Sequence, residues 1–278
     1  MSGIVLSAGV RSNLLQLQQT SNLITSTQTK LATGKRVNSA LDNPLNFFTA
    51  QSLDNRAGDL SKLLDSMSTA INTIQAANNG ITSITKLVQS AQALVSQAQQ
   101  TTDTTARKSL STQFTALLGQ IGGLAKDSGF NGINLLGGDN LTVVLNEKSG
   151  SNQSSVTVNG QNYSSTTAGT PDLSIANATG SWATTADIKN ASTDLTAALT
   201  TLRSESQALG SQLSTVQVRQ DFTKATINTL QTGSSDLTLA DSNQEGANLL
   251  ALQTRQQLST TALSLASQAD QNVLRLFG

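Results

Sequence analysis

Two apolar stripes with coiled-coil spacing, one near each end of the chain, constrain the fold more than any other feature of the sequence. The N-terminal stripe alternates intervals of four and three residues, the repeat of a helix that carries a coiled-coil seam. Its members are Leu6, Val10, Asn13, Leu17, Thr20, Ile24, Thr27 and Leu31. A similar C-terminal stripe, interrupted by Arg255 and Asn272, comprises Ala251, Leu258, Ala262, Leu265, Ala269 and Leu276. We therefore expect the two ends to pair in space.

The terminal segments carry few charges. Residues 1–31 hold two charged side chains and residues 247–278 hold three. Outer helix faces made of Ser, Thr, Gln and Asn stay soluble, yet they cost less to desolvate against another protein than faces of Lys and Glu. The ends are therefore suited to burial between subunits. Periodicity alone is equally compatible with an intramolecular helical hairpin that closes a single domain.

Composition argues against several functional classes. Lys plus Arg and Asp plus Glu balance at 17 each, and no basic cluster alternates with aromatic residues, so nucleic-acid binding is not expected. Cysteine and histidine are absent, which removes thiol nucleophiles, the commonest metal ligands and the usual general base. Neither paired acids nor a phosphate-binding loop stands out. The sequence predicts a protein that is not an enzyme and has no cofactor or metal site.

Targeting signals are equally sparse. The first residues do not combine a basic segment, a long apolar run and a small-residue cleavage site, so we expect no cleaved secretory signal peptide. No stretch approaches 18 uninterrupted apolar residues, and no membrane partner is expected. The protein is expected to be soluble and cytosolic, or to leave the cell by a route that reads no cleaved signal.

Helical spacing also dominates the segments inside the two ends. Gly34 is suited to end the first helix and Pro44 to start the next. Apolar periodicity over residues 45–100 predicts a helix of roughly 80 Å, which is the length of a rod, with a weak point at residues 78–80. A capped turn at residues 101–105 then precedes an antiparallel helix. The expected bounds of that helix are 106–126, and a break follows at 128–132.

The middle of the chain has a different pattern. Apolar and polar residues alternate over 141–147, 155–159 and 172–175 between Gly, Asn and Ser clusters, which predicts short strands or hairpins. Helical spacing returns over 184–230, and residues 233–236 are expected to interrupt it. The predicted fold is mainly α: a long antiparallel coiled-coil and helical-bundle rod of paired N- and C-terminal segments, with a small β-rich insert halfway along.

Three motifs resemble those of bacterial flagellins, the subunits of the flagellar filament. Residues 31–43, LATGKRVNSALDN, resemble the family's L-S-S-G-x-R-I-N-S-A-x-D-D. Residues 130–136, FNGINLL, resemble F-N-G-x-x-L-L, and residues 268–278, QADQNVLRLFG, resemble Q-A-N-Q-x-x-Q-N-V-L-x-L-L-x. The likeness covers about residues 1–145 and 185–278 and leaves the insert unmatched.

The resemblance implies a division of the chain into four parts. These are an inner-core coiled coil of residues 1–33 with 247–278, a spoke or connector of 34–46, an outer-core bundle of 47–140 with 184–246, and a surface-exposed β-rich insert of 141–183. It also implies termini that are disordered in the free monomer and fold on assembly, repaying about 1 kcal/mol or more per ordered residue.

The resemblance and the stripes together nominate the functional residues. The expected polymerisation interface places Leu6, Val10, Leu17, Ile24 and Leu31 opposite Leu258, Leu265, Leu274 and Leu276. The spoke residues are Gly34, Arg36, Asn38 and Asp42. Arg36 and Asp42 are candidate partners for an ion pair between elements, but the sequence favours two solvated loop charges that contribute almost nothing. The outer-core turn motif is Phe130, Asn131 and Gly132.

The implied function is that of a structural subunit, exported unfolded through the flagellar type III apparatus and polymerised at the distal tip of an extracellular filament for motility. Its implied partners are further copies of itself, flagellar cap and hook-associated proteins, and an export chaperone. The family segment read by the vertebrate innate flagellin receptor contains R-x-R-E-L, whereas residues 89–94 here are QSAQAL, which argues against receptor activation. The alternatives are a hook–filament junction protein, which resembles flagellin at both termini, and a soluble coiled-coil scaffold.

Overall fold

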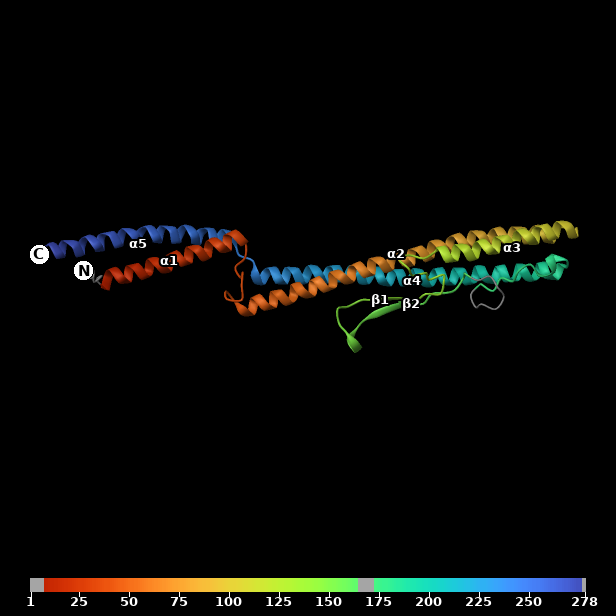
Figure 1. Ribbon diagram of the computed structural model, residues 1–278, viewed down its shortest axis with the longest axis horizontal. Helices are drawn as coiled ribbons and strands as arrows, with labels where there is room; N and C mark the ends of the chain where they lie inside the picture. The colour runs from red at the N-terminus through yellow and green to blue at the C-terminus, as the bar shows by residue number, and fades with distance from the viewer. Residues whose placement is uncertain (1–7, 165–172, 277–278) are drawn as a thin grey trace. The chain divides into compact units, whose positions relative to one another are not determined.

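The protein is mainly helical, as the sequence predicts. The computed structural model describes residues 8–164 and 173–276 (Figure 1). Within these residues the elements are α1 (Ala8–Thr33), α2 (Pro44–Gln100), α3 (Thr104–Asp127), β1 (Leu141–Val144), η1 (Gly150–Asn152), β2 (Ser155–Val158), η2 (Thr179–Trp182), α4 (Thr185–Thr238) and α5 (Ser242–Leu276). The helices flank a small middle insert, which confirms the predicted fold class.

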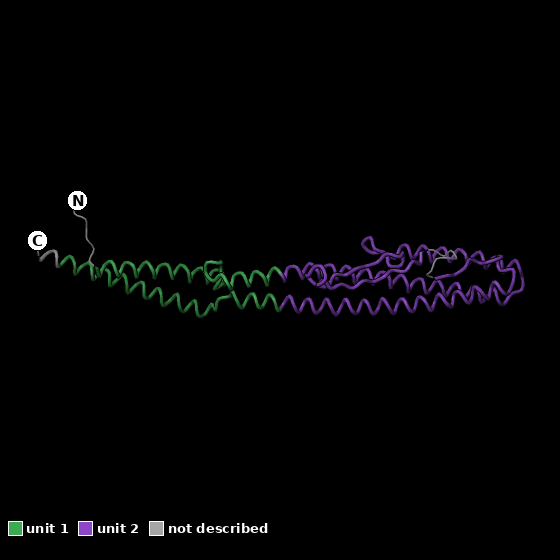
Figure 2. The backbone as a smooth tube through the Cα atoms, turned by 90° about the horizontal axis from the view of Figure 1, so that it is seen from below, with its two compact units in different colours: residues 1–55, 229–278 green, residues 56–228 purple. Residues whose placement is uncertain are grey.

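The chain divides into two compact units, coloured separately in Figure 2. Unit 1 consists of residues 1–55 and 229–278, and unit 2 of residues 56–228. Unit 1 therefore contains α1, α5, the first part of α2 and the last part of α4, while unit 2 contains α3, the insert and the rest of the two long helices.

In unit 1, α1 and α5 pack against each other and run antiparallel (Figure 1). Besides Lys30, the residues of α1 that are buried or half-buried are Val10, Asn13, Leu17, Thr20, Ile24, Thr27 and Leu31. These are the described members of the predicted stripe, so its spacing correctly identified the face of α1 that meets a partner helix. Leu6 lies outside the described residues.

For α5, the sequence predicts the wrong face as the one that packs against α1. The half-buried seam of α5 is Leu249, Leu252, Gln256, Ser259, Leu263, Ala266 and Asp270, whereas the predicted members from 251 to 269 are exposed. Leu258 is 68% exposed and Leu265 61%, so neither lies opposite the α1 stripe. Because α5 carries two stripes with the same three-and-four spacing, periodicity could not decide which of them faces α1.

The connector between α1 and α2 is tied to the link between α4 and α5. Gly34 ends α1 with a φ of +67°, a conformation that glycine adopts without steric cost. The amides of Arg36 and Val37 donate to the Thr238 carbonyl at 2.7 and 3.2 Å, and the Ala240 amide donates to the Gly34 carbonyl at 3.0 Å. Pro44 then opens α2, as predicted. Backbone hydrogen bonds therefore fix the path of the connector within unit 1.

The predicted interruption at residues 233–236 is absent, and the predicted weak point at residues 78–80 does not break α2. Residues 78–80 lie inside the continuous α2, where Ile74, Ala77 and Ile84 are fully buried. Residues 233–236 lie inside α4, which ends at Thr238 instead. Ser234 is buried and its carbonyl accepts a bond from Thr238 Oγ1 at 2.9 Å. Tertiary packing thus outweighs the low helix propensity of these short Gly, Ser and Asn runs.

Unit 2 packs α2, α3 and α4 around one apolar core, with the insert against it. The strands β1 and β2 form an antiparallel pair that places Leu141 opposite Val158 and Val144 opposite Ser155. The third expected strand, at 172–175, is wrong where the structure describes it: Ser174 has a φ of +46°, which breaks an extended backbone. The neighbouring Leu173 and Ile175 are nevertheless buried. The alternating pattern therefore comes from two single apolar side chains that pack into the core, and not from a strand.

Candidate subunit-contact surfaces

The seam between α1 and α5 is only partly apolar. On α1 it includes Thr20, whose Oγ1 donates to the Gln16 carbonyl at 2.8 Å and so satisfies the buried hydroxyl within its own helix. On α5 it includes Gln256, Ser259 and Asp270. A seam of this composition buries little apolar area per turn, so the pairing of these two helices gains less from the hydrophobic effect than a leucine-rich coiled coil would.

A second face of α5 is more apolar than the seam and is exposed. We call it the outer stripe, and its members are Ala251, Leu258, Ala262, Leu265 and Ala269. Leu258 and Leu265 are 68% and 61% exposed. Arg255 interrupts this stripe between Ala251 and Leu258, but exposed apolar residues repeated on one face of a charge-poor helix are typical of a protein–protein contact. The outer stripe is therefore the candidate contact surface of unit 1.

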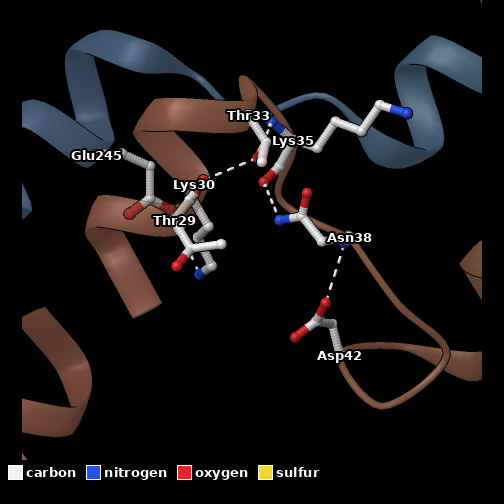
Figure 3. A network of polar contacts seen from close by, with 7 residues as sticks. All are labelled: Thr29, Lys30, Thr33, Lys35, Asn38, Asp42 and Glu245. Carbon is white, nitrogen blue, oxygen red and sulfur yellow. Dashed lines mark hydrogen bonds and ion pairs between the residues drawn. The ribbon is translucent and has the colours of Figure 1, made fainter. Parts of the chain in front are cut away.

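A groove between α1 and α5 adjoins the outer stripe at Ala251. Its volume is about 500 Å³, and its walls include the half-exposed Leu23 and the exposed Arg255. Lys30 Nζ lies 3.5 Å from Glu245 Oε1 at its edge, and Figure 3 shows these two side chains beside the connector. Because both partners remain partly exposed, the pair contributes less than about 1 kcal/mol. The groove therefore offers a concave surface with little electrostatic contribution from this pair.

The structure divides the residues predicted for the polymerisation interface into two groups. Val10, Leu17, Ile24 and Leu31 lie in the seam with α5, whereas Leu258 and Leu265 lie on the outer stripe. Leu6, and the side chains of Leu274 and Leu276, lie outside what the structure describes. Sequence reasoning missed the apolar members of the true α5 seam, Leu249, Leu252 and Leu263. The signal for them was present, since they repeat at intervals of three and eleven residues on one helical face.

The spoke residues form a local hydrogen-bond network (Figure 3). Asp42 Oδ2 accepts bonds from the amides of Asn38 at 3.0 Å and Ser39 at 2.9 Å, and from Ser39 Oγ at 3.2 Å. Asn38 Nδ2 donates to the Lys35 carbonyl at 3.0 Å. The amide donors of Asn38 and Ser39 lower the pKa of the Asp42 carboxyl. Asp42 therefore stabilises the connector by accepting backbone hydrogen bonds.

The candidate ion pair between Arg36 and Asp42 does not form, in agreement with the interpretation that the sequence favours. Arg36 Nη2 instead donates to the Leu237 carbonyl at 3.4 Å, and within the described residues Asp42 has no ion pair. The physical reason is local: the carboxylate lies within reach of two backbone amides, whereas the guanidinium is directed to the end of α4. Both side chains connect backbone segments rather than each other.

We expect the connector to loosen in acid, with a sign that follows from the lowered pKa of Asp42. A depressed carboxyl pKa gives stability that is present above the unfolded-state value and is lost as pH falls through the folded-state value. Amide hydrogen exchange of Asn38 and Ser39, corrected for intrinsic rates, should therefore accelerate below about pH 4. In Asp42→Ala the same amides should exchange at least about tenfold faster at neutral pH.

Ser39→Ala is the matched control for this measurement, because it removes the hydroxyl donor but leaves both amide bonds to Asp42. Its exchange at Asn38 should stay within about twofold of the unsubstituted chain. Equal protection in Asp42→Ala and Ser39→Ala would show that the carboxylate does not hold the connector.

The turn motif adopts a tight reversal in unit 2. Phe130 and Ile133 exchange backbone hydrogen bonds of 2.9 and 3.0 Å, while Asn131 and Gly132 have φ values of +50° and +80°. An Asn-Gly pair is the sequence that such a two-residue turn favours. Asn134, which sequence reasoning did not single out, links this turn to α3: its Nδ2 donates to the carbonyls of Ala125 and Lys126 at 2.8 and 2.9 Å. The motif therefore forms a structural turn, and Asn134 beside it caps the last carbonyls of α3.

Over the part of the chain that the structure describes, no group of three or more metal-binding side chains is found. In the same residues, no helix combines the length and apolarity needed to cross a membrane.

The antiparallel helices from the two chain ends and the small middle insert define a class of protein, the mainly helical subunit whose N- and C-terminal segments pair. The N-terminal helical region of bacterial flagellin matches residues 8–141, and the C-terminal helical region of bacterial flagellin matches residues 188–277. The chain belongs to the bacterial flagellin family. It is therefore a structural subunit that polymerises with copies of itself into the flagellar filament.

Relatives named as flagellins agree with this assignment. The chain is 30% identical to flagellin FljM of Caulobacter vibrioides over 280 residues, which cover 100% of this chain and 99% of the relative. It is 28% identical over 284 residues to a flagellin of Brucella melitensis, again over 100% and 99% of the two chains. Flagellin A of Rhizobium meliloti is 42% identical over 81 residues, 29% of this chain and 20% of the relative. These comparisons do not favour the hook–filament junction protein.

Proposed function

We propose that the outer stripe of α5 joins neighbouring copies of this chain in the flagellar filament. The observation that carries the proposal is the exposure of Leu258 and Leu265 on a helix whose other apolar face is already occupied by α1. Fully burying one leucine contributes about 1.5–3 kcal/mol, and a filament repeats the contact at every subunit. Contacts of this kind that do not close a ring generate an open helical assembly.

The remaining predicted interface residues have a supporting place in this proposal. Val10, Leu17, Ile24 and Leu31 hold α1 against α5 and so keep the outer stripe in one conformation. Leu6, Leu274 and Leu276, whose side chains lie outside what the structure describes, stay predicted members of the interface. We also propose the division of the chain into inner core, spoke, outer core and insert, with the bounds given above.

The family also supports a wider set of proposals. The chain is exported unfolded through the type III apparatus, polymerises at the distal tip and serves motility in the extracellular filament. Its further partners are the flagellar cap, hook-associated proteins and an export chaperone. Residues 89–94 lack the arginines and glutamate of the receptor-binding motif, so activation of the vertebrate receptor is not expected. The chain has no catalytic role, which its lack of His and Cys supports.

Electron microscopy of the purified chain tests the proposed function. Negatively stained samples seeded with filament fragments should show long uniform tubes, while an unseeded sample at the same concentration remains monomeric, because nucleation requires several neighbours at once. Chains that stay monomeric under seeding would contradict the filament assignment.

A further inference from the structure

A small cavity in unit 2 is lined by three cationic side chains and one carboxylate. Its volume is about 200 Å³, and it lies between α2, α4 and the segment that follows β1. Arg56 lines it from α2, Glu147 and Lys148 from the segment after β1, and Arg219 and Phe222 from α4. The cavity is smaller than the roughly 300–1,000 Å³ of a drug-sized ligand site, so its size suits a single side chain.

The charges around the cavity do not balance. Arg56 Nε is ion-paired with Glu147 Oε1. The backbone amide of Glu147, together with Arg56 and Lys148, lowers the pKa of the Glu147 carboxyl, so it is charged at neutral pH. Among the described residues Lys148 and Arg219 have neither an ion pair nor a hydrogen bond of their side chains. Two cationic groups therefore remain available at one concave site.

Lys148 and Arg219 are exposed, and apolar side chains lie beside them around the cavity. Leu60 and Leu145, which are 4% and 7% exposed, form an apolar floor. Beside them Phe222 is 63% exposed, and Val218, one turn earlier on α4, is 65% exposed. Concave apolar walls strengthen the field of nearby charges. Exposed aromatic and arginine side chains around a pocket are the composition of a binding hot spot.

We propose that this cavity receives a carboxylate side chain of a second copy of the chain. The inference rests on the proposed function, because a filament supplies a neighbouring copy to every subunit. The chain has equal numbers of acidic and basic residues, so each copy carries acids to match these cations. The described carboxylates whose side chains have no hydrogen bond or ion pair within the described residues are Asp54, Asp65, Asp127, Asp236 and Asp270. Arg219 can hold such a group through two parallel hydrogen bonds.

Charge reversal in the full-length chain tests the cavity. Arg219→Glu and Lys148→Glu should each raise the critical concentration for seeded polymerisation at least about tenfold, as expected for one lost charge-assisted contact. Arg203→Glu is the matched control, because Arg203 is an exposed arginine of the same helix that does not line the cavity. It should change the critical concentration less than about threefold. Trp182, which is fully buried in unit 2, reports by its fluorescence whether each variant is folded.

A charge swap identifies the partner. Arg219→Glu is combined in turn with Asp54→Lys, Asp65→Lys, Asp127→Lys, Asp236→Lys and Asp270→Lys, and one combination should restore polymerisation to within about threefold of the unsubstituted chain. Acetate titrated into the monomer tests whether the cavity binds a free carboxylate anion instead of a side chain of a second copy. Millimolar acetate binding that Arg219→Glu removes, with polymerisation unchanged, would assign the cavity to a free anion and overturn the proposal.

The remaining outcomes are also decisive. Normal polymerisation by both charge-reversal variants, or failure of all five swaps to restore it, would overturn the carboxylate contact while leaving the filament assignment intact. An unsubstituted chain that never polymerises with seeds would overturn the proposed function, and the contact with it.

Discussion

Replacing Leu258 and Leu265 together by glutamate is expected to give a folded chain that does not polymerise at concentrations where the unsubstituted chain forms filaments. Both side chains are largely exposed in the free chain, so the substitution removes little intramolecular packing. In the filament it removes two leucine contacts worth about 3 kcal/mol or more in total, and it adds two charges to an apolar contact. The critical concentration should therefore rise at least about a hundredfold. Sedimentation of seeded samples measures it.

The control for this variant carries the same added charge on another face of α5. Gln253 and Ser264 are exposed and lie away from both the seam and the outer stripe, so Gln253→Glu with Ser264→Glu should polymerise within about threefold of the unsubstituted chain. Far-ultraviolet circular dichroism should show equal helix content in both double variants. Filaments formed at the normal critical concentration by the Leu258 and Leu265 variant would show that the outer stripe is not a subunit contact.

The two terminal stripes show what the sequence could predict about this surface. On α1, the predicted stripe and the buried face coincide from Val10 to Leu31, because the spacing there admits one continuous seam. On α5, Leu249, Leu252 and Leu263 repeat on one face, while Leu258 and Leu265 repeat on another. On the second face, alanines occupy the positions between and beside the leucines, so its apolar pattern looks more regular. A single-sequence pattern reports that both faces are apolar. It does not report which partner covers each of them.

Local backbone signals were reliable where a conformation requires a particular residue, and unreliable where packing decides. Gly34 with its positive φ and Pro44 at a helix start were both predicted correctly. Residues 233–236 look like a break in sequence but are held in α4, because Ser234 is buried and the helix continues to Thr238. The cationic cavity had no sequence signal at all, since Arg56, Lys148 and Arg219 are brought together only by the fold.

Replacing Gly80 is expected to lower the stability of unit 2 strongly. Gly80 belongs to the predicted weak point of α2, and the structure explains why a residue without a side chain is needed there. A Cβ at this position would lie 2.2 Å from Ser128 Oγ and 2.7 Å from both Ser128 Cβ and Leu136 Cδ1. Rotating the serine side chain does not move its Cβ, and Leu136 is fully buried. The absence of a side chain therefore allows the end of α3 and the segment before β1 to approach α2 closely.

Gly80→Val should consequently destabilise unit 2 although it replaces a poor helix former. Overpacking a closed core typically costs about 1–3 kcal/mol, and two of the three contacts here are too short for side-chain rotation alone to relieve, so we expect a net loss of about 2 kcal/mol. The unfolding midpoint of unit 2 should fall by about 4–8 °C. Trp182 fluorescence during thermal unfolding measures it, because this buried indole packs on Phe114 with ring centroids 5.0 Å apart inside the same unit.

Two further variants test whether the loss of stability in Gly80→Val comes from the close packing of Ser128 and Leu136 on α2, or from replacing any helical glycine. Gly119 lies in α3, where an added Cβ would have no atom within 4 Å, so Gly119→Ala should stabilise unit 2 by about 0.5–1 kcal/mol through helix propensity alone. Ser128→Gly removes two of the three atoms that the new valine side chain would meet in the Gly80→Val chain, and it should recover at least half of the lost stability. Equal midpoints for Gly80→Val and Gly119→Ala would show that α2 tolerates a side chain at this contact. Opposite shifts, with recovery by Ser128→Gly, would show that the packing of α3 and the insert onto α2 requires glycine at this point of the helix.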